Sequence, residues 1–444
     1  MILKGNQRSG GRSLAAHLAN VRDNDHVTVH ELRSFVSGDL LGAFLEIEAA
    51  AIGTRCRQPF FSVSLNPPAD ALVHFDQYEM AAGAIEAKFP GLSAQPRAIV
   101  FHEKEGRRHA HCVWSRIDAE RGRALPLSHS RLKLRDVSRM LYAELGLEPP
   151  AGIRDERQAD PLNYDRPTWQ QAKRLGEDPR DLKQIIRQAW EVSDNLASFE
   201  AALERQALTL ARGDRRGFVV VHHSGEALSL TRYSGLKKAD IQARLGKPET
   251  LPTIDQVHDV LAVRMTAAVE HRLADLKVVQ ARQRQPLAAR LAALRQAHRA
   301  GRLALLAYQV ARRAQEDAHR AVRLRTGLMG LWDRVSGKRG RLSEQNGQEE
   351  AASRLRDRDE DQALVDTQMV DRRTLQQDVL ALRARHADER RYARAELAVM
   401  LAMMKDSARA QMQDHAAELD KVKGRGRDSA KPSGQAGPAP PRAV

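Results

Sequence analysis

Three histidines, His102, His109 and His111, lie within ten positions of one another in the first third of the chain. On a β-strand, side chains two residues apart point to the same face, so the His-Ala-His segment would present both of its imidazoles on one side. Three neutral imidazoles that converge can hold a divalent metal ion and leave positions open for substrate oxygens. The alternative is that these histidines lie in an exposed hairpin and bind no metal.

The sequence on both sides of the histidines predicts the hairpin that would position them. Residues 99–101, Ile-Val-Phe, and 112–114, Cys-Val-Trp, are apolar and rich in strand-favouring types. Residues 103–108, Glu-Lys-Glu-Gly-Arg-Arg, are polar and contain a glycine, which is typical of a turn. Two strands joined in this way would bring His102 back beside His109 and His111.

The composition indicates a polyanionic partner. The chain has 444 residues, 72 Lys+Arg, a net charge of +15 and a sequence pI of about 10.1, which favours nucleic acid. A membrane surface is the competing partner, but no apolar run approaches the ~20 residues of a membrane-spanning helix, so we expect no membrane insertion. Two cysteines provide no disulfide framework, and the N-terminus lacks a secretory pattern, so we expect a cytoplasmic protein.

The His102-Glu103 pair followed by His109-Ala110-His111 resembles a motif of the relaxases, the mobilization nucleases of the MobA/VirD2-like, MOBP-type HUH class. The resemblance covers about the first 150 residues. It implies a metal-dependent endonuclease that nicks one DNA strand at an origin of transfer, stays joined to the 5′ end and later reseals the strand. It also implies Mg²⁺ or Mn²⁺ as cofactor and single-stranded origin DNA as substrate. Accessory mobilization proteins and a type IV secretion coupling protein would be partners, with export from a bacterial cytoplasm together with the DNA.

The resemblance also directs attention to the nucleophile. Relaxases of this kind use a tyrosine near the N-terminus, but the first tyrosine of this chain is Tyr78. His17 lies where the family places its tyrosine and is followed by leucine, so His17 is the expected nucleophile, through a phosphoramidate. The alternatives are that His17 is an ordinary core or surface histidine, that His26, His30 or Tyr78 is the nucleophile, or that the protein binds DNA without cutting it.

Charged residues near the histidines are expected to assist. Glu103 would orient or activate the nucleophile, with Glu105 as the second choice, although both also suit a charged turn. Four arginines are candidate phosphate contacts or, alternatively, solvated surface residues: Arg55, Arg57, Arg107 and Arg108.

The pattern of apolar residues predicts an α+β domain with a central antiparallel sheet and flanking helices over residues 1–150. Strands are expected at 1–4, 26–32 and 59–68 and in the histidine hairpin. Helices are expected at 13–20, with Ser13 as N-cap, and at 39–52, 78–89 and 132–145. Residues 5–11 read as a flexible basic stretch and residues 151–180 as a linker. Residues 181–252 read as a small α+β module.

A long all-α region, 253–423, is predicted next, as long helices or a coiled coil, and residues 424–444 as a disordered tail. Residues 281–341 hold 15 Lys+Arg against three acids. They would lie on DNA phosphates or an acidic partner, or form a solvated helix. This basic region supports the second functional hypothesis, a non-catalytic DNA-binding or scaffold protein of a mobilization complex.

Overall fold

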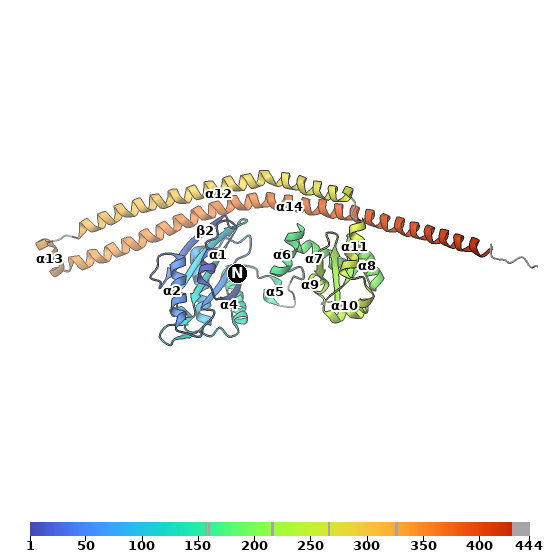
Figure 1. The fold of residues 1–444 in the computed structure, drawn as a ribbon. Helices are drawn as coiled ribbons and strands as arrows, with labels where there is room; N and C mark the ends of the chain where they lie inside the picture. The colour runs from blue at the N-terminus through green and yellow to red at the C-terminus, as the bar shows by residue number, and fades with distance from the viewer. Residues whose placement is uncertain (156–157, 159, 215–216, 265–266, 325–326, 429–444) are drawn as a thin grey trace, which may run out of the picture. The chain divides into compact units, whose positions relative to one another are not determined.

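The computed structural model describes residues 1–428 except 156–157, 159, 215–216, 265–266 and 325–326 (Figure 1). The chain forms two compact units: residues 1–160 with 282–383, and residues 161–281 with 384–444. The predicted tail, from 429 onward, lies outside the described residues, while residues 424–428 belong to a helix.

A five-stranded antiparallel sheet forms the centre of the first unit, in the order β1-β3-β5-β4-β2. The three histidines therefore lie on two of its three interior strands, β4 and β5. The strands are β1 (Ile2–Arg8), β2 (His26–Arg33), β3 (Phe60–Asn66), β4 (Arg97–Lys104) and β5 (Arg107–Ser115).

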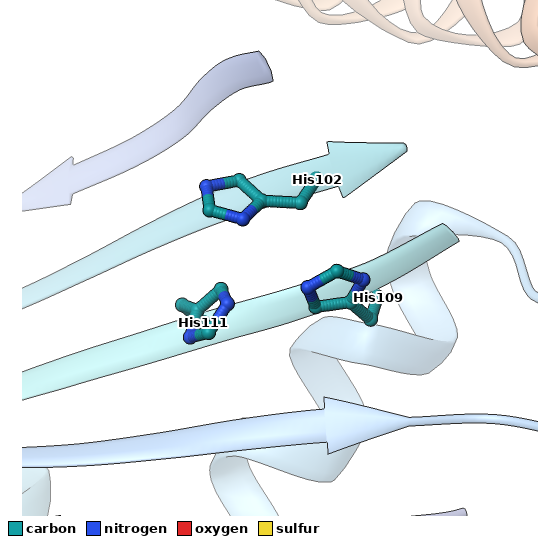
Figure 2. Close-up of side chains that lie close together, drawn as sticks. All are labelled: His102, His109 and His111. Carbon is teal, nitrogen blue, oxygen red and sulfur yellow. The ribbon is translucent and has the colours of Figure 1, made fainter. Parts of the chain in front are cut away.

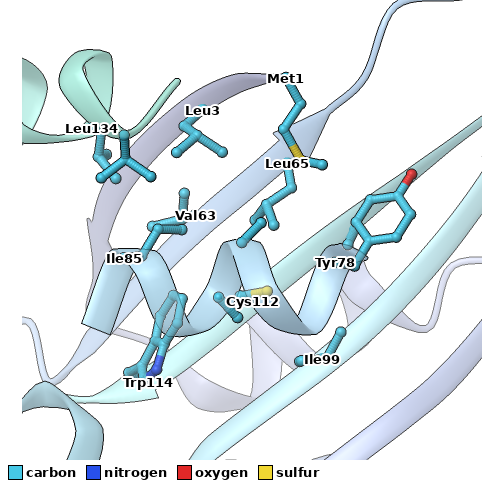
Figure 3. Packing of buried hydrophobic residues seen from close by; sticks show 14 of the residues in the cluster. Met1, Leu3, Val63, Leu65, Tyr78, Ile85, Ile99, Cys112, Trp114 and Leu134 are labelled. Atoms are coloured by element: carbon cyan, nitrogen blue, oxygen red, sulfur yellow. The ribbon is translucent and has the colours of Figure 1, made fainter. Parts of the chain in front are cut away.

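Helices cover both faces of this sheet. On the first, called the α1 face, α1 (Gly11–Leu18) and α2 (Leu40–Ile52) pack on Val100 and Val113. On the other, the α3 face, α3 (Phe75–Lys88) and α4 (Ser130–Glu144) pack on alternate residues of the same strands, among them Cys112 and Trp114 (Figure 3). Because both faces are apolar and buried, the register of each strand is strongly specified.

Short elements complete the N-terminal part of the first unit. They are η1 (Leu92–Ala94), β6 (Ile117–Asp118), β7 (Arg123–Ala124) and α5 (Ala151–Arg154).

Long helices follow: α12 (Ala267–Arg323), α13 (Gly327–Val335) and α14 (Lys338–Asp428). Within the first unit α12 and α14 run antiparallel, because Arg290 pairs with Asp378 and Arg323 pairs with Glu349. We call the described part of residues 282–383 the arm. No helix in the described residues is both long enough and apolar enough to cross a membrane.

The second unit contains a three-stranded antiparallel sheet in the order β10-β9-β8, packed by helices. Its strands are β8 (Leu208–Gly213), β9 (Gly217–His222) and β10 (Ala227–Ser229). Its helices outside α12 and α14 are α6 (Arg166–Leu175), α7 (Pro179–Glu191), α8 (Leu196–Glu204), α9 (Leu230–Ser234), α10 (Lys238–Leu245), η3 (Pro248–Thr250) and α11 (Ile254–Arg264).

The predicted fold class is confirmed: an antiparallel sheet with flanking helices precedes a long helical region. Three local predictions were wrong. Residues 5–8 continue β1, because they pair with β3. Gly10, not Ser13, is the N-cap residue of α1. The expected linker contains α6, because Ala172 packs into the core of the second unit.

Candidate metal centre

The hairpin of β4 and β5 brings the three histidines together on the α1 face. His102 and His109 are direct cross-strand partners, and His111 follows two residues along β5 (Figure 2). Their ring centroids lie 4.6 Å (102–111), 5.1 Å (109–111) and 5.3 Å (102–109) apart. One nitrogen from each ring lies within 4.8 Å of the others. This donor set fits a metal ion, because three imidazoles would leave further coordination positions open.

The turn of the hairpin explains why this register is adopted. Glu105 and Gly106 connect the strands, with φ values of 53° and 71°. Positive φ at both positions matches the twist of a tight hairpin, and glycine adopts it without steric cost. The pairing of Lys104 with Arg107 then fixes His102 opposite His109.

A backbone contact orients His102. Its Nε2 lies 2.7 Å from the carbonyl oxygen of Leu18, at the end of α1. A carbonyl only accepts, so Nε2 carries the proton and Nδ1 keeps its lone pair for a ligand. Bonds of this type fix the ring orientation of metal-binding histidines.

All three imidazoles are held in the neutral form that binds metal. Burial lowers the pKa of His102, and burial followed by the neighbouring histidine lowers the pKa of His109 to about 4. Burial, followed by His109 and His102, lowers the pKa of His111 to about 2. The cluster is therefore prepared to accept a cation at neutral pH.

His17 is the only nucleophile candidate considered above that the structure places on the α1 face. Its ring centroid lies 6.3 Å from that of His111. Leu14, Ala15 and Leu18 anchor α1 in the core beneath, while His17 is exposed. Within the described residues no hydrogen bond occupies its ring nitrogens.

The alternative nucleophiles lie on the α3 face. His26 is the cross-strand partner of Glu103, and His30 stacks on Phe75 and lies 2.7 Å from Glu79. Tyr78 is fully buried, and its hydroxyl donates to the carbonyl oxygen of Arg108. Burial raises the pKa of this phenol, so its reactive anion is disfavoured. The sheet thus separates these three side chains from the histidine cluster.

Glu103 is not where the sequence predicted it, because its side chain points to the α3 face. It is 0% exposed and forms ion pairs with Arg302 and Arg372 of the arm. Burial alone would raise the pKa of this carboxyl, but Arg302, Arg108 and Arg372 hold it below its usual range. Glu103 cannot contact a nucleophile on the α1 face. Glu105, in the turn, pairs with Arg383 instead.

The four arginines predicted to contact DNA have different surroundings. Arg108 is buried, with its guanidinium 4.4 Å from the centroid of the Phe75 ring and 3.5 Å from the Glu103 carboxylate, so the structure does not present it on the surface where DNA would bind. Arg107 is exposed, its guanidinium donates to the carbonyl oxygen of Pro67, and its charge lowers the pKa of His109.

Arg55 and Arg57 are exposed but precede Phe60, the first residue of β3. His111 lies opposite Ser64, four residues further, or about 13 Å along the strand. The structure therefore does not bring this pair to the cluster.

Sequence reasoning missed several polar residues beside the cluster. Lys4 and Ser64 are successive cross-strand neighbours of His111 on the α1 face. The charge of Arg8 lowers the pKa of His111, and that of Lys104 lowers the pKa of His109. Lys4, Ser64 and Arg8 are revealed only by the pairing of β1 with β3 and of β3 with β5, and the chain order gives no signal for this pairing.

A cluster that could hold a metal ion, beside the imidazole of His17 and with the charges of Lys104, Arg107 and Arg8 acting on it, suits chemistry on a phosphodiester. Residues 20–147 match the family model described as "Relaxase: MobA/VirD2-like, nuclease domain". The match includes all three histidines and begins after His17. No curated protein matches the chain. The N-terminal domain thus resembles the nuclease domain of the MobA/VirD2-like relaxases.

Proposed function

We propose that the protein is a relaxase, a metal-dependent endonuclease and strand transferase that nicks single-stranded DNA at an origin of transfer. In this proposal His17 is the nucleophile and His102, His109 and His111 hold the metal ion. The observation that carries it is the position of His17 beside the cluster on the α1 face. The match to the relaxase nuclease domain supports the reaction class.

The chemistry balances with His17 alone as nucleophile. A lone pair of the neutral imidazole attacks phosphorus, a P–N bond forms, and the P–O3′ bond breaks. The released 3′ oxygen takes up a proton from water, and the phosphorylated ring gives the N–H proton of its other nitrogen to the hydroxide that results, so no net proton is consumed. The 5′ phosphate stays on His17 as a phosphoramidate. Attack of a 3′-hydroxyl on this phosphorus reverses the step and reseals the strand.

This nucleophile also explains why a carboxylate base is unnecessary. A phenol must lose a proton before it attacks, whereas a neutral imidazole already has a lone pair. The location of Glu103 on the opposite face is therefore compatible with cleavage. No other acid has to take its place.

The metal ion, Mg²⁺ or Mn²⁺, would withdraw charge from the phosphate oxygens while the bond to phosphorus changes. The protein supplies three neutral donors that leave the positive charge of the cation undiminished. Lys104, Arg107 and Arg8 add positive charge around the cluster and would hold the DNA backbone.

The biological setting remains an expectation from the same resemblance. A relaxase acts in the bacterial cytoplasm, with accessory mobilization proteins, and is passed with its DNA to a type IV secretion coupling protein.

The alternative, a DNA-binding scaffold whose basic arm grips phosphates, has less support. Residues 342–383 hold six basic and ten acidic residues, in contrast to the basic segment 281–341. Arginines of α12 bind these acids, as Arg312 does with Glu360. Much of the positive charge of the arm is thus used inside the protein.

A cleavage assay tests the proposal. Labelled single-stranded oligonucleotides that tile the DNA flanking the gene would be incubated with Mn²⁺ and the wild type, His17→Ala or His109→Ala. We expect the wild type alone to give a covalent protein–DNA adduct, and this adduct to be acid-labile, as a P–N bond is.

Two results would contradict parts of the proposal. An acid-stable adduct that survives His17→Ala would move the nucleophile to an oxygen atom elsewhere. No adduct, together with tight salt-dependent DNA binding, would favour the scaffold.

A further inference from the structure

Five arginines of the arm form ion pairs or hydrogen bonds with the turn end of the histidine hairpin and with the residues next to it. Their contacts lie on Asp25, on Glu103 to Gly106 and on the loop before α3. The pairs are Arg295 with Asp25, Arg302 and Arg372 with Glu103, Arg373 with the carbonyl oxygens of Gly106 and Ala71, and Arg383 with Glu105.

Glu103 is the centre of this contact. Its Oε2 accepts from Arg302 at 2.9 Å and from Arg372 at 2.5 Å, and Arg108 lies 3.5 Å from Oε1. The side chain of Arg372 is 2% exposed. A buried carboxylate with these partners is costly to disturb, because removal of one partner leaves charge uncompensated in the interior.

The arm reaches the backbone of the turn as well. Arg373 Nε donates to the Gly106 oxygen at 3.1 Å. A Cβ on Gly106 would lie 3.1 Å from the Arg373 Cα, so the turn and α14 are in close contact. Asp25, which pairs with Arg295, donates its backbone N–H to the backbone carbonyl oxygen of Glu103 at 2.7 Å.

These contacts fall on the segments that carry two metal ligands. Glu103 directly follows His102 in β4, and Arg108 directly precedes His109 in β5. Neighbouring strand residues point to opposite faces, so the arm holds from the α3 face the backbone that presents imidazoles on the α1 face. Both histidines lie near the turn, and strand ends open more readily than strand centres.

We propose that the arm positions the metal-binding hairpin, and that Arg302 and Arg372 are positioning residues for the His102–His109 pair. Metal sites require their ligands within about 0.5 Å of the working geometry, which a free hairpin end does not ensure. The effect of the arm on metal binding follows from the contacts of the hairpin and does not require DNA cleavage. Any effect of the arm on DNA cleavage rests on the proposed relaxase function.

Full-length Arg302→Gln would be compared with Arg312→Gln. The two side chains are 14% and 17% exposed, and both form ion pairs, but the ion-pair partners of Arg312 among the described residues, Asp357 and Glu360, belong to the arm itself. The readouts are the Co²⁺ dissociation constant, the visible spectrum of the cobalt-loaded site and hydrogen exchange of residues 99–111 without metal. We expect Arg302→Gln to bind Co²⁺ about 10-fold more weakly, with a changed spectrum and faster exchange, and Arg312→Gln to match the wild type.

Two further variants separate positioning from general destabilisation. Arg302→Lys keeps the positive charge beside Glu103, so we expect it to retain most of the Co²⁺ affinity of the wild type. This variant keeps the proposal testable even if Arg302→Gln does not fold. In a cycle with Glu103→Gln, the two substitutions should be non-additive, because they remove the same ion pair.

The outcomes distinguish this proposal from the proposed function. Equal Co²⁺ affinity, spectrum and exchange in Arg302→Gln and Arg312→Gln would overturn the positioning role, whatever the cleavage assay shows. A wild type that binds no Co²⁺ would also overturn it. A clear effect of Arg302→Gln in a protein that cuts no DNA would keep the positioning role and reject the relaxase.

Discussion

The two faces of the β4–β5 hairpin contain opposite kinds of polar site. On the α1 face, His102, His109 and His111 are kept neutral by burial. On the α3 face, the ionised Glu103 is fully buried among arginines. Residues next to each other in the chain, such as His102 and Glu103, therefore belong to different environments.

The difference shows how one strand pair can combine binding with anchoring. Neutral imidazoles lose little on burial and gain a cation, whereas a buried carboxylate needs cationic partners to stay ionised. The alternation of side chains assigns each function to one face, with the backbone as the only connection between them.

The largest expected effect comes from substitution on the α1 face. His109→Gln removes one of three ligands, so we expect the single-turnover nicking rate to fall by about 10²–10³-fold or more, as for loss of a group that stabilises transition-state charge. Glu103→Gln acts only through the hairpin backbone, and a reduction on the order of 10-fold is expected. The amount of Mn²⁺ bound per protein should fall more in His109→Gln than in Glu103→Gln.

Circular dichroism of both variants would show that the fold is kept. If Glu103→Gln abolished nicking as completely as His109→Gln while Mn²⁺ stayed bound, Glu103 would have a direct part in the reaction. The separation of the two faces would then be wrong.

The α1-face site could be predicted from the sequence because its signal is local. A His-x-His pair, a third histidine and two apolar flanks define a hairpin within 21 residues, 98–118. His17 was predicted only through the resemblance. Its proximity to His111 depends on how α1 packs on the sheet.

The α3-face site could not be predicted, because its partners are distant in the chain. Arg302 and Arg372 follow Glu103 by 199 and 269 residues. Composition showed a basic segment, but basic helices on DNA and basic helices paired with an acidic helix have the same local sequence. The same limit applies to the two units, because each combines two segments that are separated by more than 100 residues of chain.

A smaller effect should distinguish Arg107 from Arg108, which lie side by side in the sequence. Arg108→Met leaves Glu103 with one cation fewer in the interior, so we expect a loss of about 3 kcal/mol in the stability of the N-terminal domain, with an unchanged salt dependence of DNA binding. Arg107→Gln should leave stability unchanged and reduce the slope of log affinity against log salt by about 1.

Thermal unfolding and fluorescence titrations at several salt concentrations would measure both quantities. A reduced salt slope in Arg108→Met, without loss of stability, would place its guanidinium on DNA and restore the original prediction.

The smallest expected effect is that of moderate acid on metal binding, and its sign depends on the burial of the histidines. Protons compete with a metal ion for imidazole nitrogens, so affinity falls once pH drops below the pKa values of the ligands. Burial, together with the charges of His102, Arg107 and Lys104, lowers the pKa of His109 to about 4, and that of His111 is about 2. Because burial also lowers the pKa of His102, Mn²⁺ affinity measured by calorimetry should fall less between about pH 7 and pH 5 than it would for three solvated imidazoles.

The same shifts have a consequence for the metal-free protein. Its unfolded state takes up protons below about pH 6.5, whereas the folded cluster does not, so stability should fall as pH decreases from 6.5 towards 4. A steep loss of Mn²⁺ affinity just below pH 6.5 would instead mean that the three imidazoles are solvated. In that case burial would not be what keeps the histidines of the α1 face neutral. The two faces of the hairpin would differ only in which residue types they carry.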